Sequence, residues 1–334
     1  MRRVKLGMVG GGQGAFIGAV HRIAARIDDR YQLIAGALSS DPQRAAASAA
    51  ELGIEADRSY HSFEEMAKAE AVRPDGIDAV SIVTPNHLHA DAAIAFLEAG
   101  IHVICDKPLS VSRAEGLRIK QCLQKSSAQF FLTHNYTGYP LIREARDMVA
   151  NGKLGNIRVI QAEYAQDWLA EPLETTGQKQ ASWRTDPKAT GGCGAIGDIG
   201  THAYNLVHYV TGLEAQELAS DLTSYVPGRV VDDNAHIWLR YEGGAKGQLW
   251  ISQVAVGNEN ALRLRIYGDK GGLEWEQENP NILWFTPLGG LCQRLTRGSG
   301  ALSEAAAVAT RIPAGHPEGY LEAFATLYSD VADV

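Results

Sequence analysis

The stretch Val9-Gly10-Gly11-Gly12-Gln13-Gly14-Ala15-Phe16-Ile17-Gly18 decides the expected fold of this chain. It follows the apolar run Val4–Val9, a predicted buried strand, and it leads into a helical pattern over Gly14–Ile27. A strand, a glycine-rich turn and a helix in this order are typical of the first unit of a doubly wound parallel sheet.

The glycines match the pattern G-x-G-x-x-[G/A], with Gly10, Gly12 and Ala15 in the three small-residue positions. Gly10 permits a tight turn, Gly12 lets a pyrophosphate approach the backbone, and Ala15 allows close helix packing. The N–H groups and the dipole of the helix start favour a bound diphosphate. We therefore expect a dinucleotide here, the alternative being a glycine-rich turn without a ligand. The expected contacts in the loop are Gly10, Gly12, Gln13, Gly14, Ala15, Phe16 and Ile17.

The first 135 residues alternate strand-like and helix-like segments with short connections. The predicted strands are Val4–Val9, Gln32–Leu38, Ala79–Val83, Ile101–Cys105 and Phe130–Thr133. The predicted helices are Gly14–Ile27, Asp41–Leu52, Phe63–Glu70 with Ser62 as its cap, His89–Ala99 and Ser112–Lys125. This alternation predicts an α/β domain of Rossmann type over residues 1–135, with a parallel sheet covered by helices on both faces.

The rhythm changes after Tyr139-Pro140, which predicts a second domain over residues 136–334. Its predicted strands are Ile157–Tyr164, His236–Tyr241, Lys246–Ser252, Leu262–Tyr267 and Leu273–Glu276, and glycine-rich turns between them favour antiparallel hairpins. Its predicted helices are Leu141–Ala150, Asp198–Val210, Leu302–Arg311 and Tyr320–Val334. We expect Trp168–Cys193 to be a long loop lining a cleft and Gln293–Gly300 to be a mobile loop. The pattern predicts an α+β domain on a large, open, mostly antiparallel sheet.

Composition excludes several classes of protein. A net charge of −8 over 334 residues leaves no basic surplus to neutralise nucleic-acid phosphates. No apolar stretch approaches the ~20 residues that a membrane span needs, and the first apolar run ends too soon for a signal peptide. The four cysteines form no CxxC pair, so a reduced, cytoplasmic compartment fits best.

The end of the second predicted strand is where an adenosine ribose is expected. An enzyme restricted to NAD usually carries Asp or Glu here, but this chain has Ser39. Ser39 and Ser40 can bond the ribose or a 2′-phosphate, and Arg44 can supply positive charge or cover the adenine. Asp41 is expected to be a helix cap, and the alternative for Arg44 is a solvated helix residue. The cofactor is therefore expected to be NAD or NADP.

Two other strand ends fall on the same rim. Lys107 follows Asp106 and precedes Pro108, so it is expected to reach the cleft, where a lysine can bond a substrate hydroxyl and share its proton. The alternative is a solvated surface lysine. Thr84, Pro85, Asn86, His89, Asp106 and Lys107 are the further expected cofactor contacts. His87 and His89 lack a Cys or carboxylate that would complete a metal site, so no metal is expected.

Asp198 and His202 stand where a glycine-flanked loop becomes a helix. A spacing of four residues puts both side chains on one helical face. A carboxylate beside an imidazole can move a proton near neutral pH. A capping Asp and a core His are the alternative interpretation.

Together these motifs resemble the glucose–fructose oxidoreductase / inositol dehydrogenase (Gfo/Idh/MocA) family. The glycine loop with His21, Thr84–His89, Asp106-Lys107-Pro108 and Gly197–His202 follow in the family's order across nearly the whole chain. The resemblance implies a Rossmann domain, a second domain whose open sheet mediates dimers or tetramers, and NAD(P)-linked chemistry at a sugar or polyol carbon. Lys107 matches the lysine of the family's Glu-Lys-Pro motif, with Asp106 in place of Glu. Asp198 and His202 match its catalytic Asp-x-x-x-His pair.

A subgroup resemblance rests on two further motifs. Ser182-Trp183-Arg184 and His316-Pro317-Glu318-Gly319-Tyr320 look like those of levoglucosan dehydrogenases. A carbohydrate or polyol is thus the expected partner, with a homodimer or homotetramer formed through the second domain's sheet. The expected substrate contacts are Lys107, Tyr136, Trp168, Trp183, Arg184, Asp198 and His202, of which the aromatic residues and Arg184 can equally be core or interface packing.

The leading hypothesis is hydride transfer between a sugar, anhydrosugar or cyclic polyol and a nicotinamide. His202 acts as general base, Lys107 orients the hydroxyl and stabilises oxyanion charge, and Asp198 positions His202 or bonds a neighbouring hydroxyl. A keto-sugar reductase or an inositol dehydrogenase is the alternative within the family. A non-catalytic NAD(P)-binding sensor is the alternative from another class.

Overall fold

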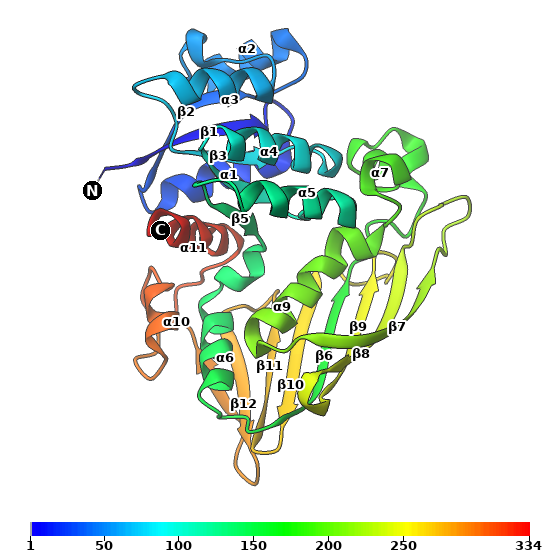
Figure 1. The fold of residues 1–334 in the computed structure, drawn as a ribbon. Helices are drawn as coiled ribbons and strands as arrows, with labels where there is room; N and C mark the ends of the chain where they lie inside the picture. Colours follow the sequence, from blue (N-terminus) through cyan, green and yellow to red (C-terminus); the bar gives the residue numbers. More distant parts are fainter. Residues whose placement is uncertain (1) are drawn as a thin grey trace. The chain divides into compact units, whose positions relative to one another are not determined.

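The structure is a computed structural model that describes residues 2–334 (Figure 1). The chain divides into two compact units. The first comprises the chain up to His134 together with Phe324–Val334, and the second is Asn135–Ala323. Each unit is described by itself.

The first unit is built on a five-stranded sheet in which every neighbouring pair of strands is parallel. The strand order is β2 (Tyr31–Ala37), β1 (Val4–Gly10), β3 (Ala79–Val83), β4 (His102–Asp106) and β5 (Phe130–Thr133). All five residues of β3 are buried, as a central strand covered on both faces requires. The predicted Rossmann-type sheet is confirmed.

Helices connect these strands. They are α1 (Phe16–Ile27), α2 (Pro42–Glu51), α3 (Phe63–Val72), α4 (His89–Glu98) and α5 (Arg113–Leu123). The connection through α1 leads from β1 to β2, toward one edge of the sheet, whereas the connections through α3, α4 and α5 lead toward the other edge. Because such crossovers are right-handed, α1 lies on one face of the sheet and α3 to α5 lie on the other. Ser62 caps α3 by accepting from the backbone N–H of Glu65, as predicted.

The C-terminal helix, α11 (Tyr320–Ala332), contributes its later turns to the first unit. The Tyr328 hydroxyl lies 2.9 Å from His21 Nδ1, and Tyr31 donates its hydroxyl to the Tyr328 carbonyl at 2.7 Å. The predicted second domain includes residues 324–334. These buried aromatic contacts join them to the first unit instead, and no local pattern in the helix reveals its partner.

The second unit is built on an eight-stranded sheet. The strand order is β13 (Gln293–Thr296), β12 (Ile282–Pro287), β11 (Gly271–Glu276), β10 (Ala261–Gly268), β6 (Ile157–Ala165), β9 (Lys246–Ser252), β8 (Asn234–Tyr241) and β7 (Ala215–Thr223). Among the strand pairs of this sheet within residues 2–334, β6–β9 is parallel and the others are antiparallel, so the predicted open, mostly antiparallel sheet is confirmed. Strands β7, β12 and β13 were not predicted from the sequence. The predicted mobile loop at Gln293–Gly300 is wrong over its first four residues, because they pair with β12.

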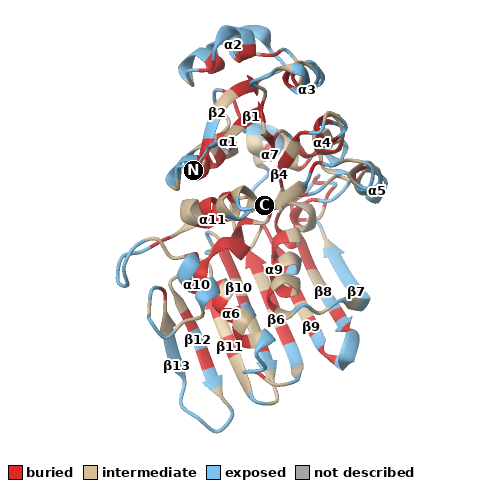
Figure 2. Ribbon diagram, turned by 60° about the vertical axis from the view of Figure 1, so that its left-hand side comes forward, coloured by how far each residue is buried: buried red, intermediate tan, exposed pale blue. Residues whose placement is uncertain are grey.

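One face of this sheet carries the core. Helices α6 (Pro140–Ala150) and α9 (Thr201–Thr211) lie over it (Figure 1). Trp275, Leu264 and Leu249 belong to the buried core of this unit. The edge strand β7 is almost wholly exposed, as Figure 2 shows. The predicted helix Leu302–Arg311 is reduced to α10 (Glu304–Val308). No helix among residues 2–334 combines the length and apolar character that crossing a membrane requires.

The segment predicted as one long loop, Trp168–Cys193, contains three short helical pieces. They are η4 (Leu173–Thr176), α7 (Lys179–Arg184) and α8 (Pro187–Thr190). Gln178 caps α7 by accepting from Ala181 N–H, and Asp186 caps α8 by accepting from Lys188 N–H. The pieces are too short to produce a hydrophobic period, so the sequence pattern did not reveal them.

Candidate active site

The glycines of the loop after β1 let it lie very close to neighbouring segments of the first unit. Gly10 has a φ of +77°, a conformation that favours glycine. A Cβ atom on Gly12 would lie 2.7 Å from the Leu38 carbonyl oxygen and 2.8 Å from Ser48 Oγ, closer than real Cβ atoms come. A Cβ atom on Gly18 would collide with Gly11, so Gly18 is the residue that permits close packing, while Ala15 is the N-cap of α1. The loop fits a diphosphate, because its glycines have no side chains to cover the backbone N–H groups and because helix α1 begins there.

Side chains hold this loop in place. Arg22 donates from Nη1 to the Gly11 carbonyl at 2.6 Å, and Gln13 N–H donates to Ser48 Oγ at 3.0 Å. A cleft of about 400 Å³ borders the loop and is lined by Gly12, Gln13 and Phe16, among others. Phe16 is 69% exposed and is thus available to a ligand.

At the end of β2, Ser39 is half-buried, whereas Ser40 and Arg44 are exposed. Asp41 caps α2, as predicted, because its carboxylate accepts from Arg44 N–H at 2.7 Å. Its own N–H donates to Ser39 Oγ at 3.1 Å. The Asp41 carboxylate is therefore engaged in capping, and hydroxyl groups with one arginine are left to contact an adenosine ribose.

Asp106 turns into the protein interior. Its Oδ1 lies 3.5 Å from Nε2 of the fully buried His21 and accepts from Thr133 Oγ1 at 3.1 Å. Burial by itself raises the pKa of Asp106, but His21 outweighs it with help from the charges of Lys107 and His89, so the net pKa is lowered. Asp106 is a predicted cofactor contact. We infer instead that it supports the half-buried Lys107 beside it.

His89 joins two loops at the same end of the sheet. Its Nδ1 lies 2.7 Å from the Pro108 carbonyl and its Nε2 lies 3.0 Å from the Thr84 carbonyl, and the ring is fully buried. We therefore infer that this predicted cofactor contact positions the loops that carry Lys107 and Thr84. Nearby, burial and the charge of Lys107 lower the pKa of His134 to about 4.

The loop after β3 lies against the glycine loop. A Cβ atom on Gly10 would lie 3.0 Å from the Val83 carbonyl and 3.2 Å from Thr84 N. Asn86 is buried in this loop, whereas Pro85 is exposed. Thr84 Oγ1 is buried and has no hydrogen-bond partner within residues 2–334. A buried hydroxyl of this kind next to Gly10 can bond a bound ligand.

In the second unit, Asp198 is held by two donors on one oxygen. Its Oδ2 accepts from Arg184 Nε at 3.2 Å and from Gln253 Nε2 at 2.9 Å. The Arg184 guanidinium carbon lies 4.2 Å from the centre of the Trp183 ring and 5.9 Å from that of Trp168. The structure thus brings three predicted substrate contacts, Arg184, Trp183 and Trp168, together around a fourth, the carboxylate of Asp198.

His202 lies among tyrosines. Its ring centre is 4.8 Å from that of Tyr136, edge to face, and 6.2 Å from that of Tyr164. The two tyrosine hydroxyls lie 2.6 Å apart, and Tyr164 donates to Asn260 Oδ1 at 2.8 Å. Burial raises the pKa of both tyrosines, so they remain neutral hydrogen-bonding groups at neutral pH.

The helix that was predicted to begin at Asp198 has an irregular start. Residues Ile196–Gly200 form a π-helical turn, and regular α-helix begins at Thr201. Single π-turns of this kind often occur at functional sites. The simple i, i+4 geometry therefore describes Asp198 and His202 only approximately.

Sequence reasoning missed four polar residues of this cluster. They are Tyr164, Gln166, Gln253 and Asn260, and they lie at the ends of β6 and β9 and the start of β10. Gln166 Nε2 donates to Asn260 Oδ1 at 2.7 Å, and Trp168 donates to Gln166 Oε1 at 3.0 Å. The sequence signal for them was the amide side chains at strand ends. To recognise that these amides meet, one must know that β6 lies between β9 and β10.

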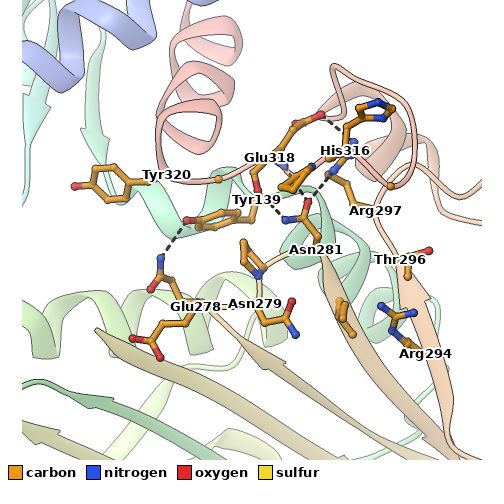
Figure 3. Close-up of a pocket in the computed structure, with 16 residues that line it drawn as sticks. Tyr139, Glu278, Asn279, Asn281, Arg294, Thr296, Arg297, His316, Glu318 and Tyr320 are labelled. Carbon is orange, nitrogen blue, oxygen red and sulfur yellow. Dashed lines mark hydrogen bonds and ion pairs between the residues drawn. The ribbon is translucent and has the colours of Figure 1, made fainter. Parts of the chain in front are cut away.

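The segment His316–Tyr320 lines a separate cleft of about 540 Å³ in the second unit (Figure 3). Buried Arg297 donates to Glu318 Oε1 at 2.9 Å and to Asn281 Oδ1 at 2.8 Å, which fixes the segment. Tyr139, on the same cleft, stacks on Tyr136 with ring centres 6.3 Å apart. Within residues 2–334, no three His, Cys, Asp or Glu side chains gather as a possible metal site.

Comparisons with known proteins agree with this arrangement. The sequence profile described as "Oxidoreductase family, NAD-binding Rossmann fold" matches residues 4–134. The profile described as "GFO/IDH/MocA C-terminal domain" matches residues 142–274.

Three relatives illustrate the similarity. An oxidoreductase structure from Sinorhizobium meliloti shares 54% identity at a TM-score of 0.91, covering 99% of this chain and 88% of that one. An inositol dehydrogenase homologue from Azotobacter vinelandii, solved with NADH and myo-inositol, shares 37% identity at a TM-score of 0.93, covering 99% and 85%. Levoglucosan dehydrogenase from Pseudarthrobacter phenanthrenivorans is 29% identical, covering 85% of this chain and 76% of its own length.

The first unit is therefore an NAD-binding Rossmann domain. The predicted resemblance is confirmed, and this chain belongs to the Gfo/Idh/MocA family of oxidoreductases.

Proposed function

We propose that the protein oxidises or reduces one carbon of a cyclic polyol, sugar or anhydrosugar. The observation that carries the proposal is the polar cluster around Asp198, where Arg184, Gln253 and Gln166 present hydrogen-bonding groups beside the faces of Trp168 and Trp183. Closely spaced donors and acceptors suit adjacent hydroxyls, and aromatic faces suit the C–H faces of a ring. Relatives solved or named with myo-inositol and levoglucosan support the same substrate class.

In the proposed reaction, His202 takes the proton of the reacting hydroxyl. Lys107, directly after β4, donates a hydrogen bond to a substrate oxygen and stabilises the negative charge that develops there. Asp198, held by Arg184 and Gln253, fixes a neighbouring hydroxyl or the imidazole. NAD, when bound, supplies the hydride acceptor or donor. Gly10 and Gly12 would hold its diphosphate, and Thr84 Oγ1 would bond it nearby.

Cofactor choice is proposed to extend to NADP. The end of β2 offers Ser39, Ser40 and Arg44, while Asp41 caps α2. Hydroxyls and an exposed arginine tolerate a 2′-phosphate, whereas a free carboxylate would repel it. Titration of nicotinamide fluorescence with NADH and NADPH measures the preference directly.

Activity measurements test the proposal. The protein is assayed at 340 nm with NAD⁺ and NADP⁺ against myo-inositol, levoglucosan and a set of simple sugars, and with keto-sugars in the reverse direction. Lys107→Met and His202→Asn are each expected to lower kcat at least about 100-fold, since each removes a proton-handling group. Lys120→Met, which alters an exposed lysine on α5, is the matched control.

Two outcomes separate the alternatives. Faster turnover of keto-sugars than of polyols would favour the reductase. Tight NADH binding without turnover of any substrate would favour the sensor and count against the dehydrogenase. Full activity in Lys107→Met would refute the role of that residue.

We further propose a homodimer or homotetramer formed through the open face of the eight-stranded sheet. Strand register places Trp238 and Trp284 in one row on that face, and the two side chains are 60% and 43% exposed. Arg265 lies between them in the row and pairs with Glu163 at 2.9 Å. Exposed aromatic side chains among paired charges are typical of an interface. Light scattering of Trp284→Lys is expected to show a smaller species than the native protein.

A cytoplasmic location is proposed from the cysteines. All four, Cys105, Cys122, Cys193 and Cys292, are free thiols in the structure. Free thiols suit a reducing compartment.

A further inference from the structure

We propose that Asp232 and Asp233 act together as a clamp that positions Asp198 for catalysis. The inference rests on the proposed function, because it assigns a positioning role toward the same site. Neither residue is among the expected catalytic or substrate-binding groups, and both lie in the loop before β8.

Asp232 holds the turn that carries Asp198. Its carboxylate accepts from Gly194 N–H at 2.7 Å and from Ile196 N–H at 2.8 Å, and its carbonyl accepts from Ala195 N–H at 2.8 Å. A Cβ atom on Gly194 would collide with the Asp232 carbonyl, so glycine is required for this approach. Three consecutive residues are thus bonded to one aspartate.

This contact replaces a missing cap. The π-helical turn begins after Ala195, which provides no side-chain hydrogen bond to the first N–H groups. Unsatisfied N–H groups at a helix start need an acceptor, and the Asp232 carboxylate supplies it from a distant segment. The turn links Asp232 to Asp198 through Gly194, because Asp198 N–H donates to the Gly194 carbonyl at 3.0 Å.

Asp233 holds the other partner of Asp198. Its carbonyl accepts from Gln253 N–H at 2.8 Å, and the Gln253 side chain donates to Asp198 Oδ2 at 2.9 Å. The Asp233 side chain is itself 1% exposed and is fixed by Arg229 at 3.2 Å and by Tyr225 N–H at 2.9 Å.

The two arms belong to neighbouring residues of one chain. The turn that carries Asp198 and the Gln253 amide that bonds it are therefore both held by the backbone segment of Asp232 and Asp233. The buried ion pair between Asp233 and Arg229 fixes this segment. Misplacing a reacting group by about 1 Å can lower a rate by about 100-fold. A clamp of this kind sets the position of Asp198 without touching the substrate.

The test is Asp232→Asn. The asparagine keeps the size of the side chain but can accept with only one of its two terminal atoms, so one bond to the turn is lost. We expect kcat to fall about 10-fold or more, with KM changed less, and we expect NADH affinity to stay within about twofold. Hydrogen exchange of the amides in residues 193–200 is expected to become faster.

Asp269→Asn is the matched control. Asp269 also accepts from a backbone N–H and a side-chain amide, both of Asn156 at 2.9 Å, but it follows β10 at the end opposite Asn260. Its replacement is expected to leave kcat and exchange in residues 193–200 unchanged. Active sites are counted by NADH binding, so loss of folded protein lowers the count and leaves kcat per site unaltered.

Unchanged kcat per site in Asp232→Asn overturns the clamp and leaves the proposed function standing. A lower kcat without faster exchange in residues 193–200 overturns it as well, because the effect would not pass through the turn. If the native protein turns over no substrate, the proposed function fails. In that case the catalytic role of the clamp fails with it, and exchange tests only whether Asp232 fixes the turn that carries Asp198: faster exchange supports this structural part and unchanged exchange overturns it.

Discussion

Replacing Arg229 with methionine is expected to destabilise the second unit strongly. The Arg229 side chain is 1% exposed. It donates to both carboxylate oxygens of Glu174 at 2.9 Å, to Asp233 Oδ2 at 3.2 Å, and to the carbonyls of Leu169 at 2.8 Å and Glu171 at 3.2 Å. One guanidinium thus ties the segment after Trp168 to the loop before β8.

The magnitude follows from what methionine leaves behind. Methionine fills a similar volume but offers no donor, so Asp233 remains a buried carboxylate whose cationic partner is gone. Removing one partner of a buried ion pair typically costs about 3–5 kcal/mol, because the remaining charge has lost its compensation. We expect a loss in this range in the free energy of unfolding.

Urea unfolding followed by tryptophan fluorescence measures this loss selectively. All six tryptophans belong to the second unit: Trp168, Trp183, Trp238, Trp250, Trp275 and Trp284. Arg240→Met is the matched control, because Arg240 pairs with Glu217 at 2.8 Å with both side chains at least 65% exposed. An exposed pair of this kind contributes about 1 kcal/mol or less.

A loss in Arg229→Met no larger than that of the control would refute the reasoning. The double variant Arg229→Met/Asp233→Asn adds a second check. Because it removes the stranded charge, it is expected to be less destabilised than the sum of its single variants. Strict additivity would show that the two residues do not act as a pair.

Three further outcomes are expected. In Gly12→Val, the new side chain begins 2.7 Å from a backbone carbonyl, so NADH affinity measured by fluorescence titration should fall about tenfold or more; unchanged affinity would contradict the placement of the diphosphate. Tyr328→Phe removes the hydroxyl beside buried His21 and should cost about 1–3 kcal/mol, measured by hydrogen exchange in the first unit. Hydrogen bonding to Arg229 lowers the pKa of Glu174 from 4.5, so its stabilising contribution is complete above pH 4.5 and is lost as pH falls toward the lower folded value. Glu174→Gln should flatten the fall in stability over that range, and an unchanged slope would exclude the linkage.

The local features of the first unit were predictable from short stretches of sequence. The glycine loop, the Ser62 cap and the strand Ala79–Val83 each depend on residues within a few positions of one another. Backbone conformation, capping and periodicity are local properties, so the sequence expresses them directly. The motifs that contain Lys107, Asp198 and His202 are local in the same sense.

The neighbours of those residues were decided only by the tertiary structure. Gln253 reaches Asp198, and Asn260 reaches Tyr164, because β6 pairs with β9 on one side and with β10 on the other. The edge strands of the second sheet and the place of α11 depend in the same way on distant partners. Pairing between segments far apart in the chain is selected by the combined burial and hydrogen bonding of the whole sheet, which no single stretch of sequence encodes.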